Sequence, residues 1–169
     1  MMKESYFESV VRIERLHRLF LEIVRVELER MQVKDINSVQ CLILYNIGRE
    51  QVTIGELTGR GYYLGSNVSY NLSKMIKNQY LIHEQSNHDR RISNVRLSEK
   101  GLALCAKIDE LFKKHAKELE QNGIGSNQLN NLVNIFNGLE GVWKSLLGGR
   151  QKWRVDQRSF PASPSQNGA

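Results

Sequence analysis

The chain has 169 residues, a length that suits one domain, with a formal net charge of +6 and an isoelectric point near 9.4. Hydrophobic residues make up 40% and charged residues 25%, which is enough for a core and ordinary for a soluble protein. This moderate positive charge permits an anionic partner without requiring one.

Cysteine usage and hydropathy exclude several classes of protein. The two cysteines, Cys41 and Cys105, are far apart and lie in no C-x-x-C pair, so the sequence indicates neither a disulfide framework nor a metal site. Charged residues from Lys3 onward interrupt any signal-peptide pattern, and no run approaches the roughly 18 apolar residues of a membrane span. We therefore expect a cytoplasmic protein that needs no metal or cofactor and does not contact a membrane.

Residues 5–31 have the pattern of one long helix. Apolar residues recur at near-helical spacing from Phe7 to Leu28, and neither glycine nor proline interrupts them. At about 1.5 Å per residue the helix would be roughly 40 Å long. That is long for a domain of this size, so part of its apolar stripe is expected to meet a second chain.

Two shorter helices are predicted next. Asn37 is a typical N-cap for an apolar helix that Gly48 ends. Thr53 and Glu56 form a T-x-x-E capping box, which predicts a second short helix ending near Gly59.

A helix with an unusual polar face follows, with Ser66 as its expected N-cap. Val68, Leu72, Met75 and Ile76 form one apolar stripe of a helix. The remaining positions carry Ser, Asn, Tyr and Lys, although small hydrogen-bonding side chains compete with the helical backbone and are poor helix formers. This polar face therefore calls for an explanation.

The rest of the chain predicts a hairpin and two helices. Residues 80–85 and 92–98 tend to alternate apolar and polar side chains around the charged segment SNHDRR, which indicates a β-hairpin. Ser98 can cap a helix over about 98–122. Steps of three and four residues from Leu129 to Leu146 form a heptad seam suited to packing against another long helix. Residues 150–169 are expected to be a disordered tail.

In this order, a capped helix, a turn, a polar-faced helix and a hairpin make a winged helix-turn-helix. A recognition helix places small donors and acceptors against base edges in the major groove, where Asn can read adenine and Lys can bind guanine or phosphate. Arginines at a hairpin tip can enter a minor groove, and Asp89 is close enough in sequence to hold that tip in shape. The alternatives are a solvated polar helix and a solvated charged turn. The predicted DNA-binding residues are Ser66, Asn67, Ser69, Tyr70, Asn71, Lys74, Lys77, Arg90 and Arg91.

The segment DRRISNVRLSEKG resembles the wing of the MarR family, D-x-R-x-x-x-V-x-L-[ST]-x-x-G. The matching positions are Asp89, Arg91, Val95, Leu97, Ser98 and Gly101. The resemblance covers about residues 5–147, and GELTGRGYYLGSNVSYNL is similar to the LdtR subgroup of alphaproteobacterial members. One departure is Gln79, where the family usually has glycine, so we expect Asn78 to take the left-handed conformation at the helix end.

This resemblance implies a mainly α fold with a small β-hairpin wing. Residues 1–149 would form one domain, with a winged helix-turn-helix over about 37–98 and dimerisation helices over about 5–31 and 98–147. It further implies a homodimeric transcriptional regulator on a pseudo-palindromic operator, with half-site centres roughly 10 bp apart. The LdtR subgroup implies control of cell-wall (L,D-transpeptidase) or stress genes.

Members of the family commonly bind small aromatic or anionic effectors. Residues that could line such a site are His17, Phe20, Cys41 and Tyr45, and the alternative for each is an ordinary core position. Both cysteines lie in apolar segments, which favours buried small hydrophobes over redox sensors.

The competing interpretation of the whole chain is a dimeric helical adaptor that binds proteins and no specific DNA. It accounts for the long helices but not for the arginine pair or the Ser/Asn face. No nucleophile with a paired base, phosphate loop or carboxylate pair indicates an enzyme.

Overall fold

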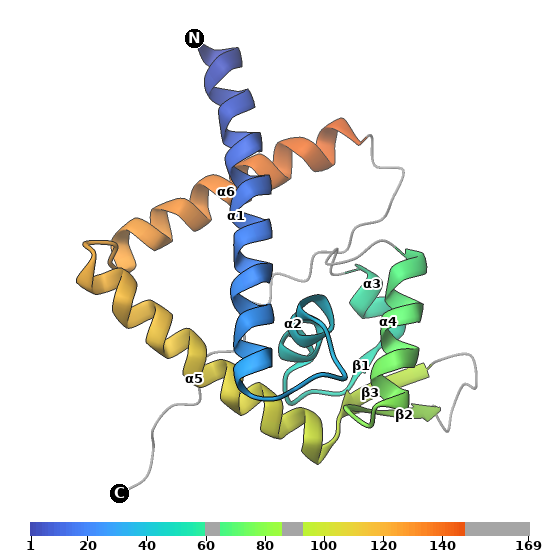
Figure 1. Ribbon diagram of the computed structural model, residues 1–169. Helices are drawn as coiled ribbons and strands as arrows, with labels where there is room; N and C mark the ends of the chain where they lie inside the picture. The colour runs from blue at the N-terminus through green and yellow to red at the C-terminus, as the bar shows by residue number, and fades with distance from the viewer. Residues whose placement is uncertain (60–64, 86–92, 148–169) are drawn as a thin grey trace, which may run out of the picture.

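The computed structural model describes residues 1–59, 65–85 and 93–147. In chain order they form α1 (Met2–Arg30), α2 (Ser38–Ile47), β1 (Val52–Thr53), α3 (Ile54–Gly59), α4 (Gly65–Lys77), β2 (Leu81–Gln85), β3 (Ser93–Leu97), α5 (Glu99–Gln121) and α6 (Ser126–Leu146). The long α1, α5 and α6 surround one side of the molecule, and α2 to β3 form a smaller unit on the other (Figure 1). The predicted mainly α fold with a small wing is confirmed.

Capping boxes begin α2 and α3, where the sequence predicts an N-cap at Asn37 and a capping box at Thr53 and Glu56. The Asn37 side chain accepts a hydrogen bond from the Gln40 N–H at 2.8 Å, and Gln40 Oε1 accepts from the Asn37 N–H at 3.1 Å. Thr53 and Glu56 make the same reciprocal pair at 3.0 and 2.8 Å. Each box satisfies backbone donors that a helix start leaves unpaired.

The predicted hairpin is one part of a three-stranded antiparallel sheet with the order β1-β3-β2. The hairpin register pairs Leu81 with Leu97 and His83 with Val95, and Val52 of β1 pairs with Val95 from the other side. Strand β1 was not predicted, because two residues are too few to show the alternation that marks a strand.

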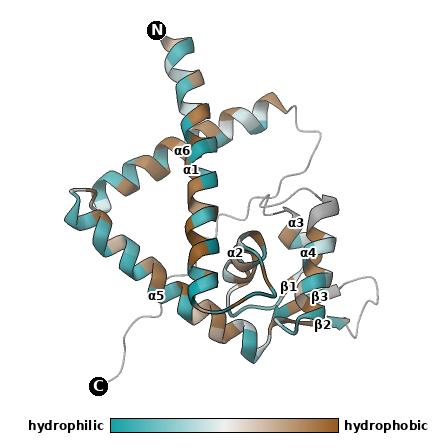
Figure 2. Cartoon of the chain, viewed as in Figure 1, coloured by the Kyte–Doolittle hydropathy of each residue, from teal (hydrophilic) through white to brown (hydrophobic). Residues whose placement is uncertain are grey.

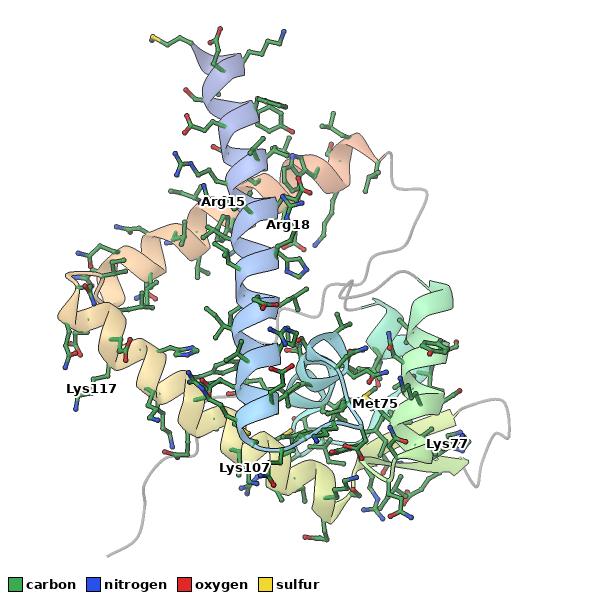
Figure 3. All side chains as sticks on the ribbon, in the orientation of Figure 1. Arg15, Arg18, Met75, Lys77, Lys107 and Lys117 are labelled. Atoms are coloured by element: carbon green, nitrogen blue, oxygen red, sulfur yellow. The ribbon has the colours of Figure 1, made fainter. Side chains whose placement is uncertain are left out.

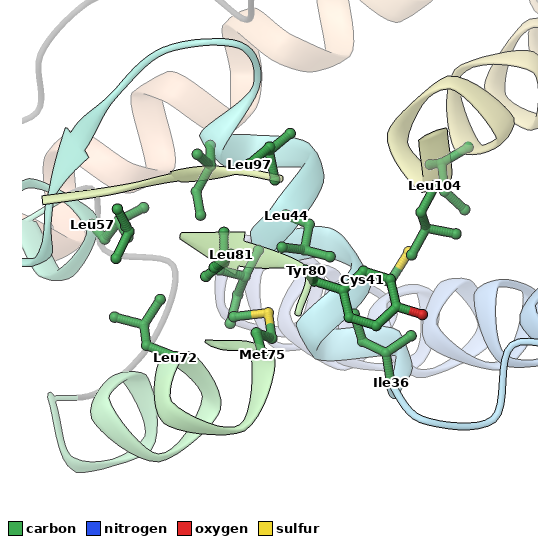
Figure 4. Packing of buried hydrophobic residues seen from close by; sticks show 14 of the residues in the cluster. Ile36, Cys41, Leu44, Leu57, Leu72, Met75, Tyr80, Leu81, Leu97 and Leu104 are labelled. Carbon is green, nitrogen blue, oxygen red and sulfur yellow. The ribbon is translucent and has the colours of Figure 1, made fainter. Parts of the chain in front are cut away.

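The core lies between α2, α4, the sheet and the first half of α5 (Figure 4). Only the C-terminal half of α1 contributes fully buried residues, Val24 and Leu28, and α6 contributes none. Many apolar positions on α1 and α6 are therefore exposed (Figure 2). The smaller unit is packed within one chain, whereas the long helices are only partly covered.

Helix α5 starts in close contact with the backbone of Tyr80. Ser98 caps the helix by accepting a hydrogen bond from the Gly101 N–H at 3.1 Å, and the Ser98 N–H donates to the Tyr80 carbonyl at 3.0 Å. A Cβ atom at Gly101 would lie 2.4 Å from that same carbonyl oxygen. Ser98 and Gly101 of the wing motif thus allow α5 to begin directly against the end of the α4–β2 turn.

Helix α4 ends at a left-handed residue, and that residue is Gln79 with φ 62°, not Asn78 as predicted. The helix runs to Lys77, so Gln79 is the position where a Schellman motif requires positive φ. The Tyr80 N–H reaches the Met75 carbonyl and the Gln79 N–H the Ile76 carbonyl, both at 2.9 Å. Asn78 is the C-cap, and its side chain binds the Asp35 carbonyl instead.

We expect Gly101→Ala to lower the free energy of unfolding by about 1–3 kcal/mol, because the added methyl group meets backbone rather than a movable side chain. Without that clash the substitution would stabilise a helix by roughly 1 kcal/mol. Urea unfolding would measure the difference. The control is Gly55→Ala, where the nearest atom is 3.8 Å away. A Gly101 variant as stable as this control would contradict the close approach.

Candidate nucleic-acid interface

The outer face of α4 carries the most direct indication of a binding surface. It consists of the exposed residues Ser69, Tyr70, Ser73, Lys74 and Lys77. Tyr70 is 66% exposed although it is a large aromatic residue. In Figure 3, Met75 lies on the side of α4 that faces α2, and Lys77 lies on the opposite side. The outer face therefore presents hydroxyl and ammonium groups to anything that approaches α4.

The electrostatics of this face differ from those of α1. Helix α4 contains no acidic residue, and within the described part of the chain Lys74 and Lys77 form no ion pair. On α1, by contrast, Arg12, Arg25 and Arg30 each pair with a glutamate one turn away. Lysines in a last turn also interact favourably with the helix dipole, so part of their role is structural. Their positive charge nevertheless stays available to a polyanion.

Asn71 does not belong to the outer face, and the prediction that it contacts bases is wrong. Its side chain is 7% exposed, and its Oδ1 accepts a hydrogen bond from Nε2 of the buried Gln40 at 3.1 Å. Residue 71 follows Val68 by three positions and precedes Met75 by four, which places it on the buried stripe. The predicted DNA-binding residues also omit Ser73, which the spacing of the apolar residues places on the outer face.

The remaining predicted DNA contacts lie at the start of α4 and at the wing. Ser66 and Asn67 are in the first turn of α4. Asp89, Arg90 and Arg91 lie outside the described residues, so their roles stay predictions. At the base of the wing, Arg96 of β3 pairs with Glu84 of β2 at 2.8 Å. This pair connects the two strands that carry the wing segment.

The four residues predicted for an effector site do not line one cavity. His17 is exposed on α1, Cys41 is buried in α2, and Phe20 and Tyr45 are half-buried. An open cleft of about 600 Å³ lies between α1, α5 and the start of α6, and only Phe20 of the four lines it. The complete lining is Phe20, Phe112, His115, Ala116, Glu118, Leu119, Asn122 and Leu129.

Tyr45 is adjacent to this cleft rather than part of its lining. Its ring meets the edge of Phe112 with centroids 4.9 Å apart, and its hydroxyl donates to Asp109 at 3.2 Å. Burial, together with this hydrogen bond to a carboxylate, raises the pKa of Tyr45. The apolar stripe of the helix predicted over 98–122 was the signal that could have identified the cleft, since Phe112 and Leu119 belong to both.

The cysteines are in settings that suppress thiolate chemistry. Burial, and secondarily the nearby Cys105, raises the pKa of Cys41 to about 12, and burial raises the pKa of Cys105 to about 11. A reactive cysteine needs the opposite shift. Among the described residues no group of His, Cys, Asp and Glu is arranged to hold a metal ion, and no helix there is long and apolar enough to cross a membrane.

Comparison with known proteins agrees with this geometry. The family model described as a winged helix DNA-binding domain matches residues 36–101, the segment from the start of α2 to the start of α5. The exopolysaccharide II synthesis transcriptional activator ExpG of Rhizobium meliloti (strain 1021) is 35% identical over 139 residues. The aligned part covers 82% of this chain and 72% of the activator.

Solved structures show the same fold. Staphylococcus aureus MarR, in complex with salicylate and kanamycin, superposes with a TM-score of 0.66 at 24% identity, covering 87% of this chain and 93% of that one. Streptococcus pneumoniae FabT, in complex with DNA, gives 0.65 at 20% identity, covering 83% and 99%. The chain belongs to the winged-helix transcriptional regulators, and its fold is that of the MarR structures.

Proposed function

We propose that the protein is a homodimer that regulates transcription in the cytoplasm by placing α4 of each copy in the major groove of a pseudo-palindromic operator. The observation that carries this proposal is the outer face of α4, which is exposed, hydroxyl-rich and free of acidic residues. A helix with glutamates on this face would repel the phosphates.

Each part of the surface has its own role in this proposal. Hydroxyls of Ser69, Tyr70 and Ser73 reach base edges, as do Ser66 and Asn67 in the first turn. The ammonium groups of Lys74 and Lys77 bind phosphate or guanine. Arg90 and Arg91 enter the adjacent minor groove, where the negative potential is strongest, and Asp89 holds them in place.

The dimer follows from apolar surface that one chain leaves uncovered. Helix α6 has no buried residue. Among the described residues, it is linked to α1 by a hydrogen bond that the Trp143 indole N–H donates to the Tyr6 hydroxyl at 2.9 Å. Apolar residues exposed on these two helices are Phe7, Val11, Leu16, Leu19, Ile23, Leu132, Val133, Ile135, Phe136, Val142 and Leu146. Exposed apolar residues in this number are typical of an association site. We assign it to a second copy, with α1, α5 and α6 of residues 1–149 forming the dimer lobe.

The cleft beside α5 is the proposed effector site. Phe20, Phe112 and Leu119 supply apolar walls, while His115 and Asn122 supply polar groups that could orient a ligand. A small aromatic compound with one anionic or polar substituent suits this lining. The related S. aureus MarR was solved with salicylate and kanamycin, which supports a ligand-responsive role.

The genes we propose as targets concern the cell surface. The subgroup resemblance indicates an L,D-transpeptidase gene, with stress genes as the wider group, and the rhizobial relative is described as an activator of exopolysaccharide II synthesis.

Selection of genomic DNA fragments by the purified protein at two salt concentrations tests the function directly. We expect one pseudo-palindrome with half-site centres about 10 bp apart to be recovered and to survive the higher salt, because base contacts add to the salt-sensitive phosphate term. Enrichment of any sequence at low salt only, or of none, would favour the adaptor interpretation.

Asn71→Ala should lower the free energy of unfolding by about 1–3 kcal/mol, because the buried Gln40 amide loses its partner. The matched variant is Tyr70→Ala at the neighbouring exposed position, which should keep its stability and bind the selected operator more weakly. Urea unfolding and operator titration of both proteins would check this. If the Asn71 variant is as stable as the wild type and has an altered base preference, Asn71 contacts bases in the major groove.

Ile135→Glu should convert the dimer to monomers, because it places a charge within the exposed apolar surface of α6 without disturbing any contact in the core. Asn134→Glu makes the same kind of change at the adjacent polar position and should remain dimeric. Sedimentation equilibrium would give the masses. If both variants stay dimeric, α6 is not at the interface.

A further inference from the structure

Asp35 lies at the centre of a hydrogen-bonded group that joins four segments of the chain. Its Oδ1 accepts from the Tyr80 hydroxyl at 2.8 Å, and its Oδ2 accepts from Lys100 Nζ at 2.7 Å. Its backbone carbonyl accepts from the Asn78 side-chain amide. Lys100 closes the group by donating to the Asn78 carbonyl at 3.0 Å. We call Asp35, Asn78, Tyr80 and Lys100 the Asp35 clamp.

The members of the clamp come from elements with different tasks. Asp35 is in the loop between α1 and α2, Asn78 ends α4, Tyr80 precedes β2, and Lys100 is in the first turn of α5. The clamp therefore connects the end of the recognition helix and the base of the wing to the two long helices α1 and α5. It lies away from the outer face of α4, so it is not a DNA contact of the kind proposed above.

The clamp has more contacts than a simple surface ion pair, although the side chains of Lys100 and Asp35 are 46% and 45% exposed. The carboxylate receives two donors, one of them charged, and Lys100 also lies 4.1 Å from the centroid of the Tyr80 ring. Burial alone raises the pKa of Asp35, but the hydrogen bonds from Lys100 and Tyr80 outweigh it and hold that pKa below its usual value. The carboxylate is thus ionised at neutral pH.

The turn that the clamp holds is strained. Gln79 has φ 62°, a left-handed conformation that is unfavourable for a residue with a side chain. Such a conformation persists only where the surroundings fix it. On one side the clamp binds Asn78 and Tyr80, which flank Gln79. On the other side the Ser98 hydroxyl donates to the Gln79 carbonyl at 2.6 Å.

We infer that Asp35 is a positioning residue that sets the angle of α4 against α1 and α5, and thereby fixes the spacing of the two recognition helices in the proposed dimer. The inference rests on the proposed function for its DNA-binding consequence. Its structural content, the coupling of the α4–β2 turn to α1 and α5, is independent of what the protein binds.

Asp35→Asn tests this inference because two effects have opposite signs. The variant removes one negative charge, which by general electrostatics should strengthen DNA binding. Loss of positioning should instead weaken binding to the selected operator about tenfold, as expected for a charged hydrogen bond that is lost. Glu110→Gln makes the same charge change on an exposed ion pair of α5 and should bind as well as the wild type or slightly better.

Operator spacing separates positioning from simple instability. Wild-type protein should discriminate strongly against operators with one base pair inserted between the half-sites, and Asp35→Asn should lose most of that discrimination. Partial unfolding would lower the affinity for all operators by one factor and leave the discrimination unchanged. If Asp35→Asn folds poorly, the same measurements are made on the double variant Asp35→Asn/Gln79→Gly, because glycine adopts positive φ without strain.

Hydrogen–deuterium exchange of the full chain gives a readout that needs no DNA. In Asp35→Asn the amides of Asn78, Gln79 and Tyr80 should exchange about tenfold faster, whereas those of α6 should not change. If wild-type protein selects no operator, the proposed function fails while this exchange result still decides the clamp. Unchanged exchange at the turn, or unchanged spacing discrimination, would overturn the inference.

Discussion

The turn between α4 and β2 is the point on which the arrangement of the smaller unit depends. Three residues, Asn78 to Tyr80, follow the last residue of α4, lead into β2 and form the surface against which α5 starts. The missing side chain at Gly101 and the cap at Ser98 permit this contact. Because the backbone of one short turn is shared by three elements, none of them can be reoriented without moving the others.

Helix α4 has polar residues with different roles on its two faces. The Asn71 side chain is buried, and its Oδ1 accepts a hydrogen bond from Nε2 of Gln40, which also completes the capping box of α2. One glutamine thereby fixes both the start of α2 and the rotation of α4. The hydroxyls and lysines on the outer face are not committed to the fold in this way. An amide in a recognition helix is evidence of base contact only where it is exposed.

Much of this fold could be predicted from the sequence because its signals are local. The caps at Asn37 and Thr53, the stripe of α4 and the hairpin each depend on residues a few positions apart. Strand β1 and the partners of Asp35 could not be predicted, since they arise from contacts between segments far apart in the chain. The error at Asn71 was different in kind. The helical period places Asn71 on the buried face of α4, although asparagine as a residue type is typical of base contact.

The lack of buried residues in α6 has a consequence for how the chain folds. Helices in proteins gain most of their stability from the packing of an apolar face, whereas the core around α2, α4 and the sheet contains no residue of α6. In the proposed dimer, most of the free energy that orders α6 comes from contacts with the second copy. Its order then depends on protein concentration, while that of the smaller unit does not. In a cell that makes few copies, the abundance of the protein would itself decide how many molecules are fully folded.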